Sequence, residues 1–559
     1  MQRLIECVPN FSEGRDLGVI DQITDAIDAV DGVRLLDVDP GAATNRTVVT
    51  FVGEPEPVIE AAVRGIATAT DLIDMRHHTG EHPRFGATDV CPLVPVRGVS
   101  MEETAEYARV LAARLADEVG LTVYCYEHAA SSDGRRNLAD VRAGEYEGLA
   151  ARLGDPAWAP DFGPVEFNAR SGATAVGARN FLVAYNVNLN TTSTRRANAV
   201  AFDVRERGRV KRVGDSLTGE IVYDDAGEKV WTPGSLQAVK GIGWYIEEYG
   251  IAQISLNLTD ISVTPIHVAF DEVVDRAADR GMRVTGSELV GLVPLDAMLE
   301  AGRYFLRKQQ RSVGVADAEL IKIAVKSLGL DDLYPFDPQQ KIIEYAIEDR
   351  TDRLVDQTLR GFVEETASES VAPGGGSVSA AVGALGAALG AMVANLSAHK
   401  RGWDDRWEEF SDWADRGKRY HDELLRLVDA DTDAFNGIMA AYGLARSTAE
   451  EAAIRDRAIQ DATRAAIEVP LRVMEVSVGA LEVAAAMAEH GNPNSVSDAG
   501  VGALCARTAA LGAYLNVQIN VGDLADEAER LSYLARGAAL RDEAIERESS
   551  VLDIVAQRI

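Results

Sequence analysis

The sequence predicts an α+β protein over its first part and an all-α helical bundle over its last part. Up to about residue 345, strand-like runs of β-branched and aromatic residues alternate with amphipathic stretches, a rhythm that produces sheets with helices on one face. Beyond residue 356 the strand signals stop and long amphipathic stretches continue to Ile559, which indicates a helical bundle. We therefore predict α+β subdomains over 1–178 and 179–345, a linker over 346–355 and a helical domain over 356–559.

Composition narrows the class of protein further. A net charge of −32 with 47% hydrophobic residues describes a globular chain with an acidic surface. Such a surface repels nucleic-acid backbones and anionic membranes, so neither is an expected partner. The four cysteines are widely separated, without the spacing of a zinc site or a disulfide framework. The first residues lack a signal-peptide layout, and a cytoplasmic location is expected.

The expected elements of the first subdomain follow from hydrophobic periodicity. Helices are expected at Asp16–Val30, ended by Gly32, and at Glu56–Thr70 and Met101–Glu118. Strands are expected at Leu4–Val8, Val33–Val38, Thr47–Val52, Val90–Val96 and Leu121–Tyr126.

The second subdomain repeats this rhythm after Gly172–Arg179, which we interpret as the connection between the two subdomains. Gly208–Pro233, polar and rich in Gly and Asp, is expected to form an exposed hairpin. Strands are expected at Phe181–Val187, Ala252–Leu258 and Met282–Val284, and helices at Thr192–Glu206, Ser235–Tyr249 and Pro265–Arg280.

In the helical region, the stretch Val378–Leu396 is long and apolar enough to suggest a membrane span. We reject that interpretation, because its alanines and glycines supply little transfer energy and no partner spans occur. Its small residues instead recur at helical spacing and favour close approach of another helix, within the bundle or in a dimer. These residues are Gly383, Gly386, Ala387 and Gly390.

A polar loop over Arg76–Val90 is the first candidate site. It holds three histidines, including His82, together with two arginines and two carboxylates. Gly80 and Pro83 break any helix there, and an apolar run follows at once. Histidines on a loop held by a strand suit acid–base chemistry, although a solvated loop with hydrogen-bonding histidines has the same pattern.

Two further clusters of polar residues are candidates. The connection between the second and third strands is longer than a simple turn, so Asp39, Asn45 and Arg46 are candidate ligand contacts, with a self-bonded turn as the alternative. Asp429 and Asp433 lie four residues apart on one helix face, where like charges are unfavourable. A solvated acidic face is the alternative there.

Three unusual strings carry a resemblance to a known family. Leu4–Gly14 and Gly80–Arg84 resemble formiminotransferases, and Ala372–Ser377 resembles the cyclodeaminase half of formiminotransferase-cyclodeaminase. The resemblance runs over nearly the whole chain. It implies a cytoplasmic folate enzyme of histidine breakdown, with N-formimino-L-glutamate and tetrahydrofolate as substrates, with or without a polyglutamate tail. It also implies a homo-oligomer of even number and no metal.

The resemblance also implies site residues. His82 matches the catalytic position of the transferase, and Asp429 aligns with the catalytic aspartate of cyclodeaminases. Arg46 and Arg84 are expected to pair with substrate carboxylates. Folate is expected on one segment, in which Arg170 would attract and Glu166 would repel a folate carboxylate. That segment consists of Gly163, Pro164, Val165, Glu166, Phe167, Asn168, Ala169, Arg170, Ser171 and Gly172.

Three alternatives remain open at this point. The helical domain also resembles methenyl-tetrahydrofolate cyclohydrolases, which would replace ammonia by water as the partner of the folate carbon. It could instead be a non-catalytic oligomerisation bundle. A zinc site at His78 and His82 is a third reading, disfavoured because two ligands rarely hold zinc and no third lies nearby.

Overall fold

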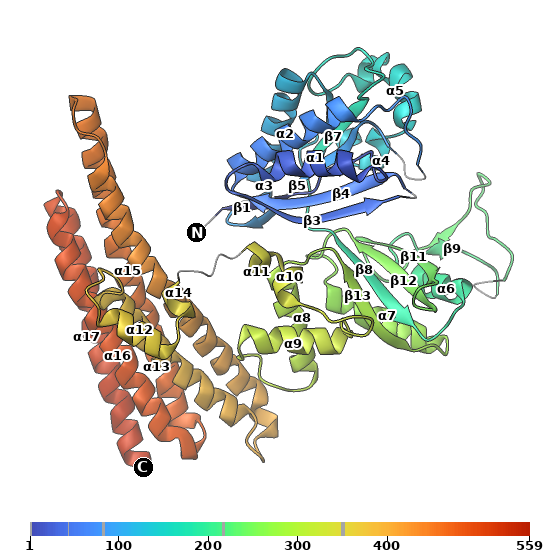
Figure 1. Cartoon of the computed structure of the whole chain (residues 1–559). Coiled ribbons are helices and arrows are strands. Elements are labelled where there is room, and N and C mark those ends of the chain that lie inside the picture. The colour runs from blue at the N-terminus through green and yellow to red at the C-terminus, as the bar shows by residue number, and fades with distance from the viewer. Residues whose placement is uncertain (1–2, 43, 81–83, 215–217, 348–352) are drawn as a thin grey trace. The chain divides into compact units, whose positions relative to one another are not determined.

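The computed structural model describes residues 3–42, 44–80, 84–214, 218–347 and 353–559. The chain forms two compact units (Figure 1). The first unit contains residues 1–297 and 328–348, and the helical unit contains residues 298–327 and 349–559.

The first unit begins with a mixed seven-stranded sheet. Its strand order is β3, β4, then β1 and β2 end to end, then β5, β7 and β6. The pairs on the β3 side are antiparallel, whereas β7 is parallel to both β5 and β6. The strands are β1 (Leu4–Cys7), β2 (Asn10–Phe11), β3 (Val33–Gly41), β4 (Arg46–Gly53), β5 (Thr88–Arg97), β6 (Thr122–Glu127) and β7 (Ala173–Ala178).

Helices cover one face of this sheet (Figure 1). They are α1 (Leu17–Asp28), α2 (Pro55–Leu72) and α3 (Met101–Arg114), the last continued by a π-helical turn over Leu115–Val119. Side chains alternate between the two faces of a strand, so Ile5 and Cys7 of β1 enter the core beneath the helices. Glu6, between them, therefore points to the opposite face.

A second, antiparallel four-stranded sheet follows in the same unit. Its order is β11 (Val239–Ile246), β12 (Ile251–Leu258), β8 (Val183–Leu189) and β13 (Val284–Val290). The helices α6 (Thr194–Val204) and α7 (Ile266–Asp279) pack against it. Between α6 and β11, the short strands β9 (Arg209–Val210) and β10 (Trp231–Thr232) pair as a hairpin, as expected for Gly208–Pro233.

Most of the expected elements are confirmed, but three expectations are wrong. Residues 235–249 contain strand β11 instead of a helix: Gly241 and Gly243 disfavour a helix, and a Cβ at position 243 would overlap the backbone of α6. The strand expected at Met282–Val284 begins only at Val284 and runs to Val290. Gly172–Arg179 contains β7, a fully buried strand whose small apolar residues lack the alternation of a half-exposed strand.

Short helices connect these larger parts. The sequence analysis missed α4 (Leu138–Val141) and α5 (Glu145–Leu153), which lie between β6 and β7. After β13 the chain continues through α8 (Leu295–Lys308), α9 (Asp317–Leu328), α10 (Pro338–Lys341) and α11 (Ile343–Ile347).

The helical unit is a bundle of long helices with α12 (Leu359–Thr366) beside them. The long helices are α13 (Gly375–Ala398), α14 (Trp407–Gly443), α15 (Ala449–His490), α16 (Val496–Asn520) and α17 (Glu527–Arg558). Residues 298–327, which we assigned from sequence to the second subdomain, pack with this unit. Within it, the Val313 N–H donates to Ser411 Oγ at 3.1 Å, and the buried Lys418 ammonium lies 2.7 Å from Asp317.

Helix α13 is the centre of the bundle. It passes a length and apolarity test for a membrane span, but 61% of its most apolar stretch is buried inside the unit. A Cβ at Gly386 would lie 2.7 Å from the Gly502 carbonyl oxygen of α16, and one at Gly390 would lie 3.0 Å from Val483 of α15. The small-residue stripe therefore brings neighbouring helices of the same chain close together.

We predict opposite effects for two glycine-to-alanine changes in this unit. Gly386→Ala should lower the free energy of unfolding by about 1–3 kcal/mol, because α16 must move away from the new methyl group. A Cβ at Gly437 on α14 would lie within 4 Å of no other atom. Gly437→Ala should therefore raise the free energy of unfolding by about 0.5–1 kcal/mol, because alanine favours a helix. Chemical denaturation measures both. Equal effects would show that α13 and α16 do not approach each other closely.

Candidate active sites

One edge of the seven-stranded sheet gathers most of the residues predicted for the first site. β3 ends there, β4, β5 and β7 begin there, and β2 pairs with both β4 and β5 at the same level. This topology brings Asp39, Asn45, Arg46 and the segment ending at Gly172 to one place. His82 lies outside the described residues, but its loop leaves and rejoins the described chain at this edge, at Gly80 and Arg84.

Asn45 and Arg46 have different surroundings there. Asn45 has a positive φ of 50°, and its side-chain amide is used within the chain: it accepts from the Gly14 N–H at 3.0 Å and donates to the Thr79 carbonyl at 3.1 Å. Arg46 donates to Asn10 Oδ1 and lies 4.0 Å from the buried Asp89. Burial lowers the pKa of Arg46, and Asp89 opposes this. Asn45 thus shapes the loop, while Arg46 holds a buried positive charge.

Arg84 is already paired within the chain. Its guanidinium makes two hydrogen bonds to the Glu147 carboxylate and one to Glu145, and lies over the Tyr146 ring. The 163–172 segment packs against the same loop: Ala87 N–H donates to the Ser171 carbonyl at 2.8 Å. Arg170 donates to the Asp71 carbonyl at the end of α2, so its guanidinium too has a partner within the chain.

Several buried polar atoms at this edge have no hydrogen-bond partner among the described residues. They are His78 Nδ1, Thr88 Oγ1 and Ser171 Oγ. Buried polar groups are normally hydrogen-bonded, so a group of unsatisfied atoms marks a place where a ligand or an ordered water supplies the partner. This observation supports a ligand site at the predicted edge.

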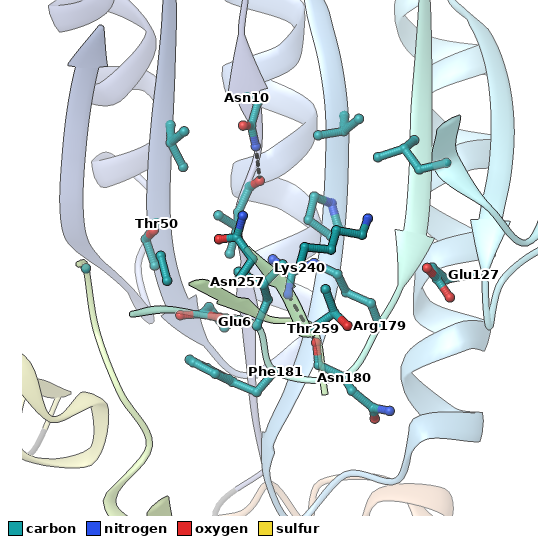
Figure 2. A pocket seen from close by; sticks show the side chains of 18 of the residues that line it. Glu6, Asn10, Thr50, Glu127, Arg179, Asn180, Phe181, Lys240, Asn257 and Thr259 are labelled. Atoms are coloured by element: carbon teal, nitrogen blue, oxygen red, sulfur yellow. Dashed lines mark hydrogen bonds between the residues drawn. The ribbon is translucent and has the colours of Figure 1, made fainter. Parts of the chain in front are cut away.

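A cavity of about 890 Å³ extends from this edge between the two sheets of the first unit. Its walls are the sheet faces that α1–α3 and α6–α7 leave uncovered, including Asp39, Arg46 and Asn10 from the first sheet and Lys240 and Asn257 from the second. Figure 2 shows side chains from both sheets directed into this space. The volume falls within the range of small-molecule sites.

Charges of both signs line this cavity. Arg142, 2.6 Å from Asp89, adds to the positive charge of Arg46 near the sheet edge. Farther along lie Arg179 and Lys240. The carboxylates of Asp37, Asp39, Glu127 and Asp260 line the same cavity, so the positive charge is confined to the places where these cations lie.

Glu6 is the buried carboxylate of the cavity. Its side chain is 4% exposed, and it makes no hydrogen bond or ion pair with any described residue. Burial raises its pKa from 4.5 to about 7, against the opposing influence of Arg179. The sequence analysis missed Glu6, Arg142 and Arg179. A charged residue inside the apolar run Leu4–Val8 was the one available signal for Glu6.

The second candidate site lies in the helical unit around Asp429 on α14. The Leu354 N–H donates to Asp429 Oδ1 at 2.7 Å. Burial raises the pKa of Asp429, while the N–H groups of Leu354 and Val355 lower it. Asp433, the predicted neighbour, is exposed and adds a smaller upward influence. Asp429 is therefore a half-buried carboxyl group with a raised pKa.

Asp431, which the sequence analysis did not single out, holds the glycine-rich turn against α14. Its Oδ2 accepts from the Ser377 N–H at 2.9 Å and from the Ser377 hydroxyl at 3.1 Å. A Cβ at Gly376 would overlap this carboxylate, which explains the glycine there. Asp429 and Asp431 lie two residues apart on α14 and therefore face different directions, so the turn Pro373–Ser377 contacts α14 beside Asp431 and Val428.

On α16, two polar side chains that lie among apolar residues bond to backbone carbonyl groups. Asn516 donates to the Gly512 carbonyl and Asn520 to the Ala466 carbonyl. Asn516 also lies near Gly375 of the glycine-rich turn. Among the described ranges, no group of three or more His, Cys, Asp or Glu side chains is arranged to hold a metal ion.

Comparison with known proteins follows this two-site layout. Models of the formiminotransferase domain match residues 4–179 (its N-terminal subdomain) and 184–348, and a formiminotransferase-cyclodeaminase model matches residues 358–538. Formimidoyltransferase-cyclodeaminase from Mus musculus is 43% identical over the full length of both chains. The chain belongs to the formiminotransferase-cyclodeaminase family.

Two shorter relatives each match one part of this family member. Glutamate formimidoyltransferase from Thermoplasma acidophilum is 40% identical over 306 residues, 54% of the chain and 92% of the relative. Methenyltetrahydrofolate cyclohydrolase from Methylorubrum extorquens is 36% identical over 201 residues, 35% of the chain and 97% of the relative. In this chain, the cavity between the sheets lies in the part matched by the formiminotransferase models, and Asp429 lies in the part matched by the formiminotransferase-cyclodeaminase model.

We predict that Glu6 makes stability depend on pH. Between pH 4.5 and pH 7 the folded chain keeps this proton and the unfolded chain releases it. The folded state then binds more protons, so the free energy of unfolding falls as pH rises through this window, by about 3 kcal/mol in total. Glu6→Gln should lack this loss, so its advantage over the parent should grow from pH 4.5 to pH 7 in chemical denaturation. A constant difference would contradict the assignment.

Proposed function

We propose that this chain transfers the formimino group of N-formimino-L-glutamate to N5 of tetrahydrofolate. It then cyclises the 5-formimino product to 5,10-methenyl-tetrahydrofolate and releases ammonia. The observation that carries the proposal is the 43% identity to a formimidoyltransferase-cyclodeaminase over the whole chain. The two sites support it, because one lies in each part of the chain. The shared one-carbon folate intermediate explains why both activities occur in one chain.

The transfer step takes place at the edge of the seven-stranded sheet in this proposal. N5 attacks the amidine carbon, and the bond from that carbon to the glutamate nitrogen breaks. His82 takes the N5 proton and returns a proton to the departing nitrogen, because a histidine titrates near neutrality and serves as either base or acid. Arg46 attracts a substrate carboxylate, and folate lies along 163–172, where Thr88 and Ser171 offer unsatisfied hydroxyl groups.

The cyclisation takes place at Asp429. N10 attacks the formimino carbon and its proton passes to the terminal nitrogen. Asp429 donates a second proton to that nitrogen, and the bond between it and the carbon breaks as ammonia leaves. Burial raises the pKa of Asp429, which is the direction that favours a proton donor.

A second candidate function for the helical unit is hydrolysis of methenyl-tetrahydrofolate, favoured by the 36% identity to a cyclohydrolase over this part of the chain. The two functions can be distinguished by their products, since only cyclodeamination releases ammonia.

We also propose that the chain forms a cytoplasmic homo-oligomer of even number. Helices α13 and α16, which pack against each other, both expose apolar side chains. They are Leu385, Met392 and Leu396 on α13 and Val501, Leu504, Leu515 and Ile519 on α16. A self-complementary face of this kind suits a twofold contact with a second copy, and pairs of such dimers give even numbers.

We expect the two activities to be separable by mutation. His82→Ala should lower the rate of glutamate release by about 10²–10⁴-fold. The rate of deamination of supplied 5-formimino-tetrahydrofolate should not change. Asp429→Asn should do the reverse, with the Leu354 hydrogen bond retained by the amide oxygen. Glutamate, ammonia and methenyl absorbance, followed together, measure both.

A loss below tenfold for either variant would contradict the role given to that residue. Methenyl turnover without ammonia from supplied 5-formimino-tetrahydrofolate would favour the cyclohydrolase function. Asp433→Asn is the matched control, because Asp433 lies one turn from Asp429 but is exposed. It should leave both activities intact.

A separate test addresses the oligomer. Leu385→Glu places a charge in the centre of the apolar face and should reduce the sedimenting mass. Leu17→Glu on α1 is the control, since Leu17 and Leu385 are both 60% exposed. An unchanged mass for Leu385→Glu would show that a second copy does not cover this face.

A further inference from the structure

We propose that Glu6 binds the planar amidine edge of a substrate, two N–H donors carried by one N–C–N unit, inside the cavity between the two sheets. The proposal rests on the proposed transferase function and assigns a binding residue to it. Both substrates of that reaction contain such an edge. One is the formimino group, and the other is the 2-amino-pyrimidine side of the pterin ring.

The strand geometry places the Glu6 carboxylate in the cavity. Glu6 pairs with Val52 of β4 and Val94 of β5, so it lies in the middle of the sheet. Its neighbours Ile5 and Cys7 enter the helix-covered core, and strand alternation directs Glu6 to the other face. Figure 2 shows it among the side chains that line the cavity.

Within the part of the chain that the structure describes, the Glu6 carboxylate has no hydrogen-bond or ion-pair partner. It makes no hydrogen bond or ion pair with a described residue, although 96% of the side chain is buried. Arg179 lowers its pKa and Glu344 raises it, but burial is the largest influence. A buried carboxyl without a partner costs stability, so its presence on a cavity wall indicates a ligand that supplies hydrogen-bond donors.

The chemistry of the carboxylate selects the ligand edge. Its two oxygens accept two parallel N–H bonds, as in a bidentate arginine pair, and an amidine offers the same fork. Such a pair satisfies both oxygens at once, which a single donor cannot do. Glu6 lies four residues from Asn10, about 13 Å along the strands at 3.3 Å per residue. This distance from the reacting edge favours the pterin ring over the formimino group.

Binding measurements with separate substrates test the proposal. Glu6→Gln keeps the size of the side chain but replaces one acceptor oxygen by a donor. We expect tetrahydrofolate to bind at least tenfold more weakly, with little change for N-formimino-L-glutamate. A tetrahydrofolate analogue with hydrogen in place of the 2-amino group should bind the parent weakly and be insensitive to the substitution. Glu54→Gln, at an exposed carboxylate, is the control and should bind both substrates normally.

The stability of the ligand-free variant provides a second readout. Glu6→Gln removes an unpaired buried carboxylate, so it should raise the melting temperature at pH 8 while it lowers the affinity for tetrahydrofolate. A glutamate with only a structural role would not give this combination. Glu6→Asp keeps the charge on a shorter side chain and should bind tetrahydrofolate with intermediate strength.

The remaining outcomes are distinguishable. Weaker N-formimino-L-glutamate binding with normal tetrahydrofolate binding would assign the amidine edge to the formimino group. Normal binding of both substrates by Glu6→Gln, with an active parent, would overturn this inference alone. A parent chain that binds neither substrate would overturn the proposed function and this inference with it.

Discussion

The first unit depends on the two-residue period of its strands. Each sheet buries one face beneath helices, and alternation then directs every second side chain to the other face. In β1 this places Ile5 and Cys7 in the core and Glu6 in the cavity. The faces of the two sheets that enclose the cavity carry charged side chains, such as Arg46 on the first sheet and Lys240 on the second. The same strands therefore supply the core with one face and the cavity with the other.

The helical unit depends on small residues that let its helices pack closely. Glycines on α13 let α16 and α15 approach within one chain, and Gly376 makes room for the Asp431 carboxylate. Asp431 is occupied by Ser377, and Asp429 is left with one oxygen bonded to Leu354. These three neighbouring aspartates of α14 therefore have different tasks: Asp431 holds a turn, Asp429 is proposed to donate a proton, and Asp433 is exposed.

The sequence predicted the elements with clear periodicity, such as α1, α2, β4 and the long helices. It failed where small residues replace the usual pattern. β7 is buried on both faces and β11 carries glycines that contact α6, so neither shows strand alternation. Asp39 and Arg46 were predicted from the length of the loop between them, whereas the segment ending at Gly172, which is far from them in sequence, could be predicted only through family resemblance. Glu6 was missed because its meaning depends on the second sheet, which sequence periodicity does not place.

The central claim is that the space between the two sheets holds the transferase ligands. The most direct measurement is a crystal structure of the full chain with tetrahydrofolate bound. The account predicts the pterin ring between the sheets, with its 2-amino edge within hydrogen-bond distance of Glu6 and its reacting nitrogen toward the edge formed by Arg46 and Thr88. A pterin bound outside this cavity, with the Glu6 carboxylate still unpaired, would contradict it.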